Sequence, residues 1–240
     1  GDPDARLYKV IEYLTPEAAE AYQNDPAALA RIVELKYPKP SPREADFAPM
    51  YGYVDTFMTG SKQISAGQKL DMINLSNAVD HALFINLCAA EDNRFKNVYF
   101  LSRIEADGAR RMTKIPWDLN YTFGHGHDGA KALRTTFFPE LITSTQLPPD
   151  VTALLKLMPD RLGPLLNVRW LELRGDIFSE EALLSRFSAA MSTLTSGGAF
   201  ARDAARWPDS QSSAKLDEIA LFVHGRLAFL DAYYAKLAAP

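Results

Sequence analysis

Three polar residues in the middle of the chain have types and a spacing that suit phosphoryl transfer. Asp92 is followed five residues later by Asn97, and Asp118 lies beyond a segment whose pattern predicts a β-hairpin. Phosphoryl transfer requires a carboxylate that orients the attacking hydroxyl group and oxygen ligands that hold Mg²⁺. Asp92 is the candidate for the first role, and the Asn97 amide oxygen and the Asp118 carboxylate are candidates for the second.

Protein kinases place these residue types in the same order: a catalytic Asp, an Asn five residues on, a short hairpin and a metal-binding Asp. The usual kinase signature sequences do not occur at these positions, so the match is one of spacing and role. The simpler alternative is that Asp92, Asn97 and Asp118 only mark turns.

Composition indicates an ordinary globular protein. Of the 240 residues, 47% are apolar and 23% are charged, which allows a sizeable core. The net charge of −4 gives no electrostatic case for binding nucleic acid, and no apolar run is long enough to span a membrane. The single cysteine, Cys88, excludes an internal disulfide, and its apolar neighbours favour a buried structural thiol.

The hydrophobic pattern predicts an α+β chain that is mainly helical. Alternating apolar residues predict strands at 7–11 and 32–37, and Thr15 followed by Pro16 has the form of a helix start. The Pro-rich stretch at 38–42 is the expected linker. A helix at about 43–59 and a loop at 60–68 are expected to follow the linker.

The site is expected to lie between a buried helix and the hairpin. The helix expected at about 75–90 is apolar on nearly every face, so it is predicted to be central and to lead into the Asp92 loop. Strands at 98–101 and 112–115, joined by a turn at 106–108, form the predicted hairpin.

From about residue 148 onward the chain is predicted to be helical. Ser179 is expected to cap one helix, whose inner stripe comprises Leu183, Leu184, Phe187, Ala190, Met191 and Leu194. The last helix has a similar stripe of Leu216, Ile219, Val223, Leu227, Leu230 and Tyr234. Both stripes are expected to pack in the core.

Two segments around the hairpin give a more specific signal. They are KNVYFL at 96–101 and PWDLNYTFG at 116–124. These segments, with weaker counterparts toward the end of the chain at 169–174, 202–208 and 226–231, resemble the CotH family of spore-coat kinases. The resemblance implies an atypical protein-kinase-like fold, of which this chain is the large, C-terminal lobe, with the small hairpin holding the site.

The resemblance also implies an activity, which is ATP- and Mg²⁺- (or Mn²⁺-) dependent phosphorylation of Ser or Thr in a partner protein. Asp92 becomes the catalytic Asp, and Asn97 and Asp118 become metal ligands. Asn120 becomes a further ligand at a position where the family usually has an acid, and its neutral amide is expected to lower metal affinity. Family members suggest a location on the spore coat, at the cell surface or outside the cell.

The start of the chain departs from the family pattern. The family's small lobe, with its phosphate-facing Lys or Arg, precedes a strand that resembles Arg6–Lys9 here. Residues 1–42 are therefore expected to be remnant strands and a helix that bridge to a missing small lobe. Residues 43–240 are expected to be the large lobe with a helical C-terminal extension. On this view the chain as given binds metal but transfers phosphate weakly or not at all.

Further side chains near the hairpin suit such a site. Arg94 and Lys96 are placed to stabilise a transferred phosphate, with solvated loop charges as the alternative. Trp117 is a candidate to line the nucleotide pocket. The alternative is that it packs in the core behind the loop that contains Asp118. His125 and His127 are expected in a substrate-facing loop, because no third His or Cys lies nearby to complete a zinc site.

Two other functions also fit the sequence. One is a non-catalytic module for structural or spore-coat assembly, which the absent lobe and Asn120 favour. The other is a metal-dependent phosphohydrolase, which is less favoured because Lys96 and Asn97 follow Asp92 as in kinases.

Overall fold

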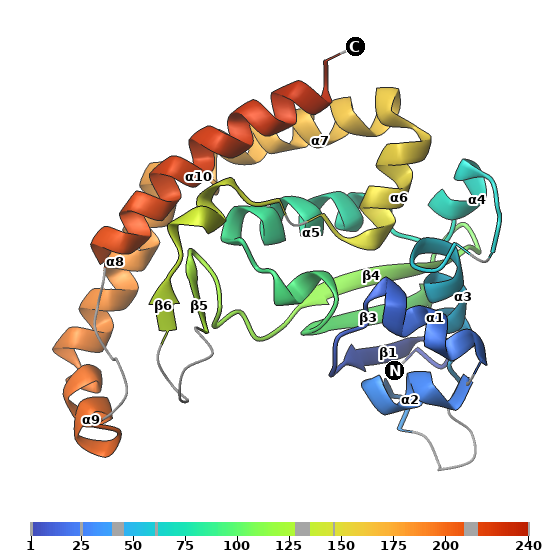
Figure 1. Cartoon of the computed structure of the whole chain (residues 1–240), viewed down its shortest axis with the longest axis horizontal. Helices are drawn as coiled ribbons and strands as arrows, with labels where there is room; N and C mark the ends of the chain where they lie inside the picture. The colour runs from blue at the N-terminus through green and yellow to red at the C-terminus, as the bar shows by residue number, and fades with distance from the viewer. Residues whose placement is uncertain are drawn as a thin grey trace. The chain divides into compact units, whose positions relative to one another are not determined.

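The protein is mainly helical with a small antiparallel sheet, as the computed structural model shows (Figure 1). The described residues are 2–24, 26–39, 46–60, 62–127, 135–145, 147–208 and 216–239. The predicted mixture of helix and sheet is confirmed. None of the helices in these described ranges is long and apolar enough to cross a membrane.

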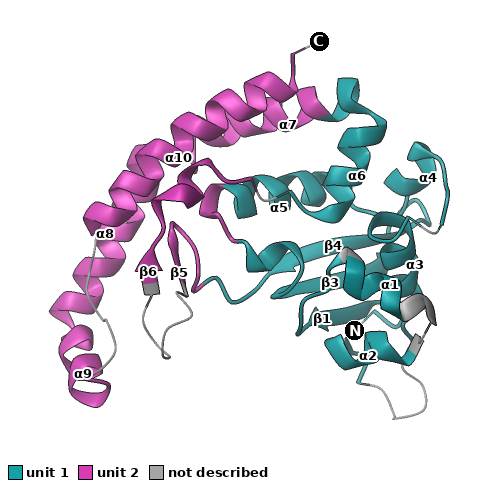
Figure 2. Ribbon diagram, viewed as in Figure 1, with its two compact units in different colours: residues 1–86, 91–119, 146–162 teal, residues 87–90, 120–145, 163–240 magenta. Residues whose placement is uncertain are grey.

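The chain forms two compact units (Figure 2). The first comprises residues 1–86, 91–119 and 146–162, and the second comprises residues 87–90, 120–145 and 163–240. Strands from both sides of residue 42 belong to one sheet of the first unit. The predicted division of the chain near residue 42 stays a prediction.

The sheet of the first unit positions the hairpin. Its strands are β1 (Arg6–Val10), β2 (Val33–Tyr37), β3 (Val98–Ile104) and β4 (Arg110–Pro116), in the order β2-β1-β3-β4 and all antiparallel. All four predicted strands are confirmed. The hairpin turn is closed by the Glu105 amide, which donates to the Ala109 carbonyl at 2.9 Å. Gly108 adopts a φ of +82° in that turn, a conformation that glycine tolerates best.

The described α-helices that accompany the sheet of the first unit are α1 (Pro16–Asn24), α2 (Leu29–Ile32), α3 (Ala48–Phe57), α4 (Ala66–Leu70), α5 (Leu75–Cys88) and α6 (Pro149–Leu157). The last two residues of α5 belong to the second unit. Thr15 begins α1 as predicted, because its hydroxyl accepts the Ala18 amide at 3.2 Å. The expected loop at 60–68 is wrong at its end, where Ser65 and Gln68 form a capping box that starts α4. Residues 40–45, within the predicted linker and helix, lie outside the described part of the chain.

Helix α5 is buried, as predicted. Ala82, Leu83 and Ile85 have no exposed surface. The Asn77 side chain exchanges two hydrogen bonds with the backbone of Lys114 on β4, at 2.7 and 3.0 Å. This contact fixes α5 against the edge of the hairpin. Cys88, at the end of α5, is buried, and burial raises the pKa of its thiol to about 12, which fits a structural role.

An ion pair also lies inside the first unit. Lys114 Nζ on β4 donates to both carboxylate oxygens of Asp150 at 2.7 Å, and both side chains are buried. Burial lowers the pKa of Lys114, and the Asp150 carboxylate opposes that shift. Burial, and then the same carboxylate, raises the pKa of Tyr53 on α3. The pair therefore ties the hairpin to α6 inside the core.

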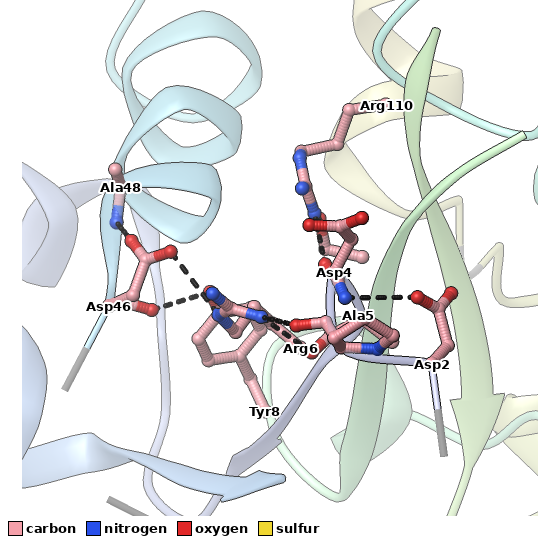
Figure 3. A network of polar contacts seen from close by, with 10 residues as sticks. Asp2, Asp4, Ala5, Arg6, Tyr8, Asp46, Ala48 and Arg110 are labelled. Atoms are coloured by element: carbon pink, nitrogen blue, oxygen red, sulfur yellow. Dashed lines mark hydrogen bonds and ion pairs between the residues drawn. The ribbon is translucent and has the colours of Figure 1, made fainter. Parts of the chain in front are cut away.

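A polar network anchors the start of β1 (Figure 3). Arg6 Nε donates to Asp46 Oδ2 at 3.2 Å, and the Tyr8 hydroxyl donates to the Asp46 carbonyl at 2.7 Å. Arg110 Nη1 on β4 donates to the Asp4 carbonyl at 2.8 Å. Contacts from both sides thus hold the first strand beside the hairpin.

The second unit is built around long helices. Its elements include β5 (His125–His127), β6 (Thr135–Phe137), α8 (Glu180–Ser196), α9 (Ala199–Arg206), α10 (Leu216–Leu237) and, from Gly163 onward, α7 (Pro159–Arg174). The fully buried Trp170 donates its indole N–H to Asp231 at 2.7 Å. A Cβ atom at Gly163 would lie 2.0 Å from the Leu237 carbonyl oxygen, so α7 and α10 pack too closely there for any other residue.

The two predicted core stripes have different outcomes. On α10 the later positions Val223, Leu227, Leu230 and Tyr234 are buried, as expected. Ser179 caps α8 as predicted, since its hydroxyl accepts the Ala182 amide at 3.2 Å. The prediction that the α8 stripe packs in the core is wrong beyond the first turns of the helix. Leu183 is buried, but Ala190 and Leu194 are exposed. An amphipathic pattern shows which face prefers burial, but it does not supply the element that covers it.

Candidate functional site

The Asp92 loop is a tight turn held by its own backbone. Asp92–Arg94 forms a single 3₁₀ turn, and the Asp92 carbonyl accepts the amides of Phe95 at 3.1 Å and Lys96 at 2.7 Å. The buried Asn93 side chain donates to the carbonyls of Asn97 at 2.7 Å and Trp117 at 2.9 Å. Asn93 therefore joins the loop before the hairpin to the loop after it, a role that the sequence analysis did not assign.

Asn97 and Asp118 lie at the same end of the hairpin. The Trp117 amide donates to the Asn97 carbonyl at 2.8 Å, directly beyond the strand pair of Val98 and Pro116. Asp118 follows Trp117, so the backbone brings the two predicted metal ligands together. Their assignment as ligands stays a prediction.

Both residues have an uncommon backbone conformation. Asn97 has a φ of +53° and Asp118 a φ of +55°, in the left-handed region that few residues other than glycine adopt. Asn and Asp tolerate this region better than other residues, and such conformations concentrate at functional sites. Asn97 is 9% exposed, whereas Asp118 is exposed. An amide oxygen and an open carboxylate are ligand types that Mg²⁺ accepts. Asn120 belongs to the second unit, and its role stays a prediction.

Tyr13 is a site residue that sequence reasoning missed. Its hydroxyl group donates a hydrogen bond to Oδ1 of Asp92, and the Leu14 amide donates to the Phe95 carbonyl at 2.8 Å. The Asp92 hydrogen bond is the main cause that raises the pKa of Tyr13 to about 12, with burial contributing less. Tyr13 and Asp92 are 79 positions apart, so no local pattern signals the contact.

The two predicted phosphate-facing cations have contacts of their own. Arg94 Nε donates to the Leu147 carbonyl at 3.3 Å, and its guanidinium carbon lies 4.8 Å from the centre of the Phe95 ring. Lys96 Nζ lies 5.1 Å from the centre of the Tyr13 ring. Lys96 therefore lies over the tyrosine ring whose hydroxyl group contacts Asp92, while Arg94 supports the loop through its contact with Leu147. Their roles in phosphate binding stay predictions.

Trp117 does not pack in the core. Its side chain is 51% exposed, so the alternative that placed it behind the metal loop is wrong. The Trp117 ring meets the Tyr99 ring edge to face, with centres 5.8 Å apart. Its contact with a nucleotide stays a prediction, and the half-exposed ring is accessible to such a ligand.

The histidine segment begins as a strand. His125 and His127 belong to β5, which pairs with β6. His125 Nε2 lies 3.1 Å from Glu218 Oε2. Residues 128–134 lie outside the description, so the predicted substrate-facing loop is not tested. In the described ranges no three His, Cys, Asp or Glu side chains group in a way that would hold a metal ion.

The fold and the hairpin geometry are consistent with the protein-kinase-like class. Comparison with known families supports this class, because the family model described as CotH kinase protein matches residues 34–230. The chain therefore belongs to the CotH kinase family, and the resemblance seen in the sequence is confirmed. No curated protein matches the chain significantly.

Proposed function

We propose that the protein transfers the γ-phosphoryl group of ATP, in the presence of Mg²⁺ or Mn²⁺, to a Ser or Thr hydroxyl group of a partner protein. The main support is the hydrogen bond from the Trp117 amide to the Asn97 carbonyl, which brings Asn97 and Asp118 to one end of the hairpin. Membership of the CotH kinase family makes a kinase-like function the leading interpretation.

Each residue has a role that its surroundings permit. Asp92 would accept a hydrogen bond from the acceptor hydroxyl and orient it for attack. The Asn97 amide oxygen and the Asp118 carboxylate would hold the metal ion, which supplies charge neutralisation for the phosphate oxygens. Lys96 would place positive charge near the transferred group. The rigid hairpin, fixed by α5 and the buried Lys114–Asp150 pair, would keep these side chains in place.

Label transfer from γ-labelled ATP to casein, with Mg²⁺ or Mn²⁺, tests the proposal. We expect metal-dependent incorporation that Asp92→Asn and Asp118→Asn each reduce by at least about a hundredfold. Asp71→Asn is the matched control, because Asp71 is an exposed acid of the same unit. Equal incorporation by Asp92→Asn and the unsubstituted chain would contradict the proposal.

A non-catalytic assembly module is the second candidate. The observation that favours it is the Tyr13 hydroxyl, which already occupies an oxygen of Asp92. For this function we expect metal and partner binding to persist in Asp92→Asn, with no label transfer by any variant. The phosphohydrolase alternative predicts release of labelled inorganic phosphate and no labelled protein.

A further inference from the structure

A cation and two aromatic rings gather on one face of the sheet, beside the loop that contains Asp118. Lys9 Nζ lies 5.5 Å from the centre of the Trp117 ring and 5.8 Å from that of Tyr99. Strand pairing explains the cluster, because Lys9 on β1 is the direct partner of Tyr99 on β3. The buried neighbours Tyr8 and Val10 show that Lys9 is on the opposite, more open face of the strand.

Contacts with Asp46 and Arg110 hold the backbone that leads into Lys9. Arg6 and Tyr8 bind Asp46, and Arg110 binds the Asp4 carbonyl, so β1 is anchored immediately before Lys9 (Figure 3). A side chain on a paired strand loses less conformational entropy on ligand binding than one on a free loop.

Lys9 forms no ion pair in the described part of the chain, although Glu34 on β2 is its strand partner, and its ammonium group lies over aromatic rings instead. The neighbouring Lys36 differs, because it forms an ion pair with Glu34. A cation held over aromatic faces keeps its full charge and its N–H donors on the side away from the rings. Such a group is suited to meet an anion.

The surroundings create a need for such a cation. Asp92 and Asp118 lie on the two loops that Asn93 joins at the end of the hairpin, and a polyphosphate would be repelled there unless positive charge offsets their negative charge. We propose that Lys9, supported by Tyr99 and Trp117, binds the phosphate groups of the nucleotide whose metal ion Asn97 and Asp118 would hold. This inference rests on the proposed function, and it adds a residue that the sequence analysis treated only as part of a family-like strand.

Titration calorimetry with three ligands tests the inference. The ligands are Mg²⁺-ADP, Mg²⁺-pyrophosphate and adenosine. We expect Lys9→Gln to weaken binding of Mg²⁺-ADP and Mg²⁺-pyrophosphate by about tenfold, because a charge-assisted contact to phosphate is lost. Adenosine carries no phosphate, so its affinity should not change. Lys62→Gln is the matched control, because Lys62 is an exposed lysine of the same unit, and it should leave all three affinities within about twofold of the unsubstituted chain.

Two results would overturn the inference in distinguishable ways. If the unsubstituted chain binds Mg²⁺-ADP and Lys9→Gln binds it equally well, Lys9 only packs on the rings, and the proposed function stands. In that case the thermal unfolding midpoint of Lys9→Gln should fall while its affinities do not change. If the unsubstituted chain binds neither Mg²⁺-ADP nor Mg²⁺-pyrophosphate, both the inference and the proposed function fail.

Discussion

The hydroxyl group of Tyr13 donates a hydrogen bond to the carboxylate of Asp92, although the two residues are 79 positions apart. In the proposed reaction the acceptor hydroxyl requires the same carboxylate. Tyr13 is 48% exposed, so little packing opposes its displacement. The contact therefore places an intrachain competitor at the acceptor position.

Tyr13→Phe should increase label transfer to casein by roughly threefold to tenfold at low acceptor concentration. The variant removes the competing hydroxyl but keeps the ring beside Lys96, and one exposed hydrogen bond to a carboxylate corresponds to a change of about this size. Tyr37→Phe is the matched control, since Tyr37 is another partly exposed tyrosine of the first unit. Lower transfer by Tyr13→Phe would mean that Tyr13 positions Asp92 instead of competing for it.

The same contact predicts a pH dependence of stability. The pKa of Tyr13 is raised from its ordinary value of 10 to about 12 in the folded protein, so the bond stabilises fully below pH 10. The contribution of this bond to the unfolding free energy falls as the pH rises from 10 to 12, because the Tyr13 hydroxyl ionises at lower pH in the unfolded chain than in the folded protein. The difference in unfolding free energy between the unsubstituted chain and Tyr13→Phe should therefore narrow over this range, as measured by urea denaturation. If the difference in unfolding free energy between the two proteins stays constant from pH 9 to 12, the hydrogen bond to Asp92 does not raise the pKa of Tyr13.

The buried pair of Lys114 and Asp150 predicts a non-additive mutational response. Lys114→Met leaves an unpaired carboxylate in the core and should cost about 3–5 kcal/mol of unfolding free energy. The double variant Lys114→Met with Asp150→Leu removes both charges, so its cost should be well below the sum of the two single changes. Urea denaturation of the four proteins measures this cycle. Additive costs would indicate that water reaches the pair.

Helix α5 predicts a contrast between two leucines. Leu83→Ala should cost about 2–5 kcal/mol of unfolding free energy, because Leu83 on α5 is fully buried. Leu171 on α7 is 57% exposed, so Leu171→Ala should change stability by no more than about 0.5 kcal/mol. Equal losses in thermal or urea unfolding would contradict the central position of α5.

Local patterns predicted the hairpin and the placement of Asn97 and Asp118, because both lie within two residues of paired strands. A one-dimensional pattern could not show the contacts of Tyr13 or Lys9, which depend on how distant strands and loops meet. The Ser65–Gln68 capping box was a readable signal for α4, but the glycine and serine around it favoured a loop prediction. The exposed half of α8 shows that periodicity gives a preferred face without the partner that buries it.

A titration of the ¹⁵N-labelled protein with Mn²⁺, followed by nuclear magnetic resonance, most directly tests whether the end of the hairpin is a metal site. Paramagnetic broadening should appear first at the amides of Asn97, Trp117 and Asp118, and addition of ADP should shift it to lower Mn²⁺ concentrations. Asp118→Asn should raise the Mn²⁺ concentration required, whereas Asp71→Asn should not. Broadening that begins instead at the acidic turn of Glu105 and Asp107, or that is unchanged by Asp118→Asn, would contradict the assignment of the site.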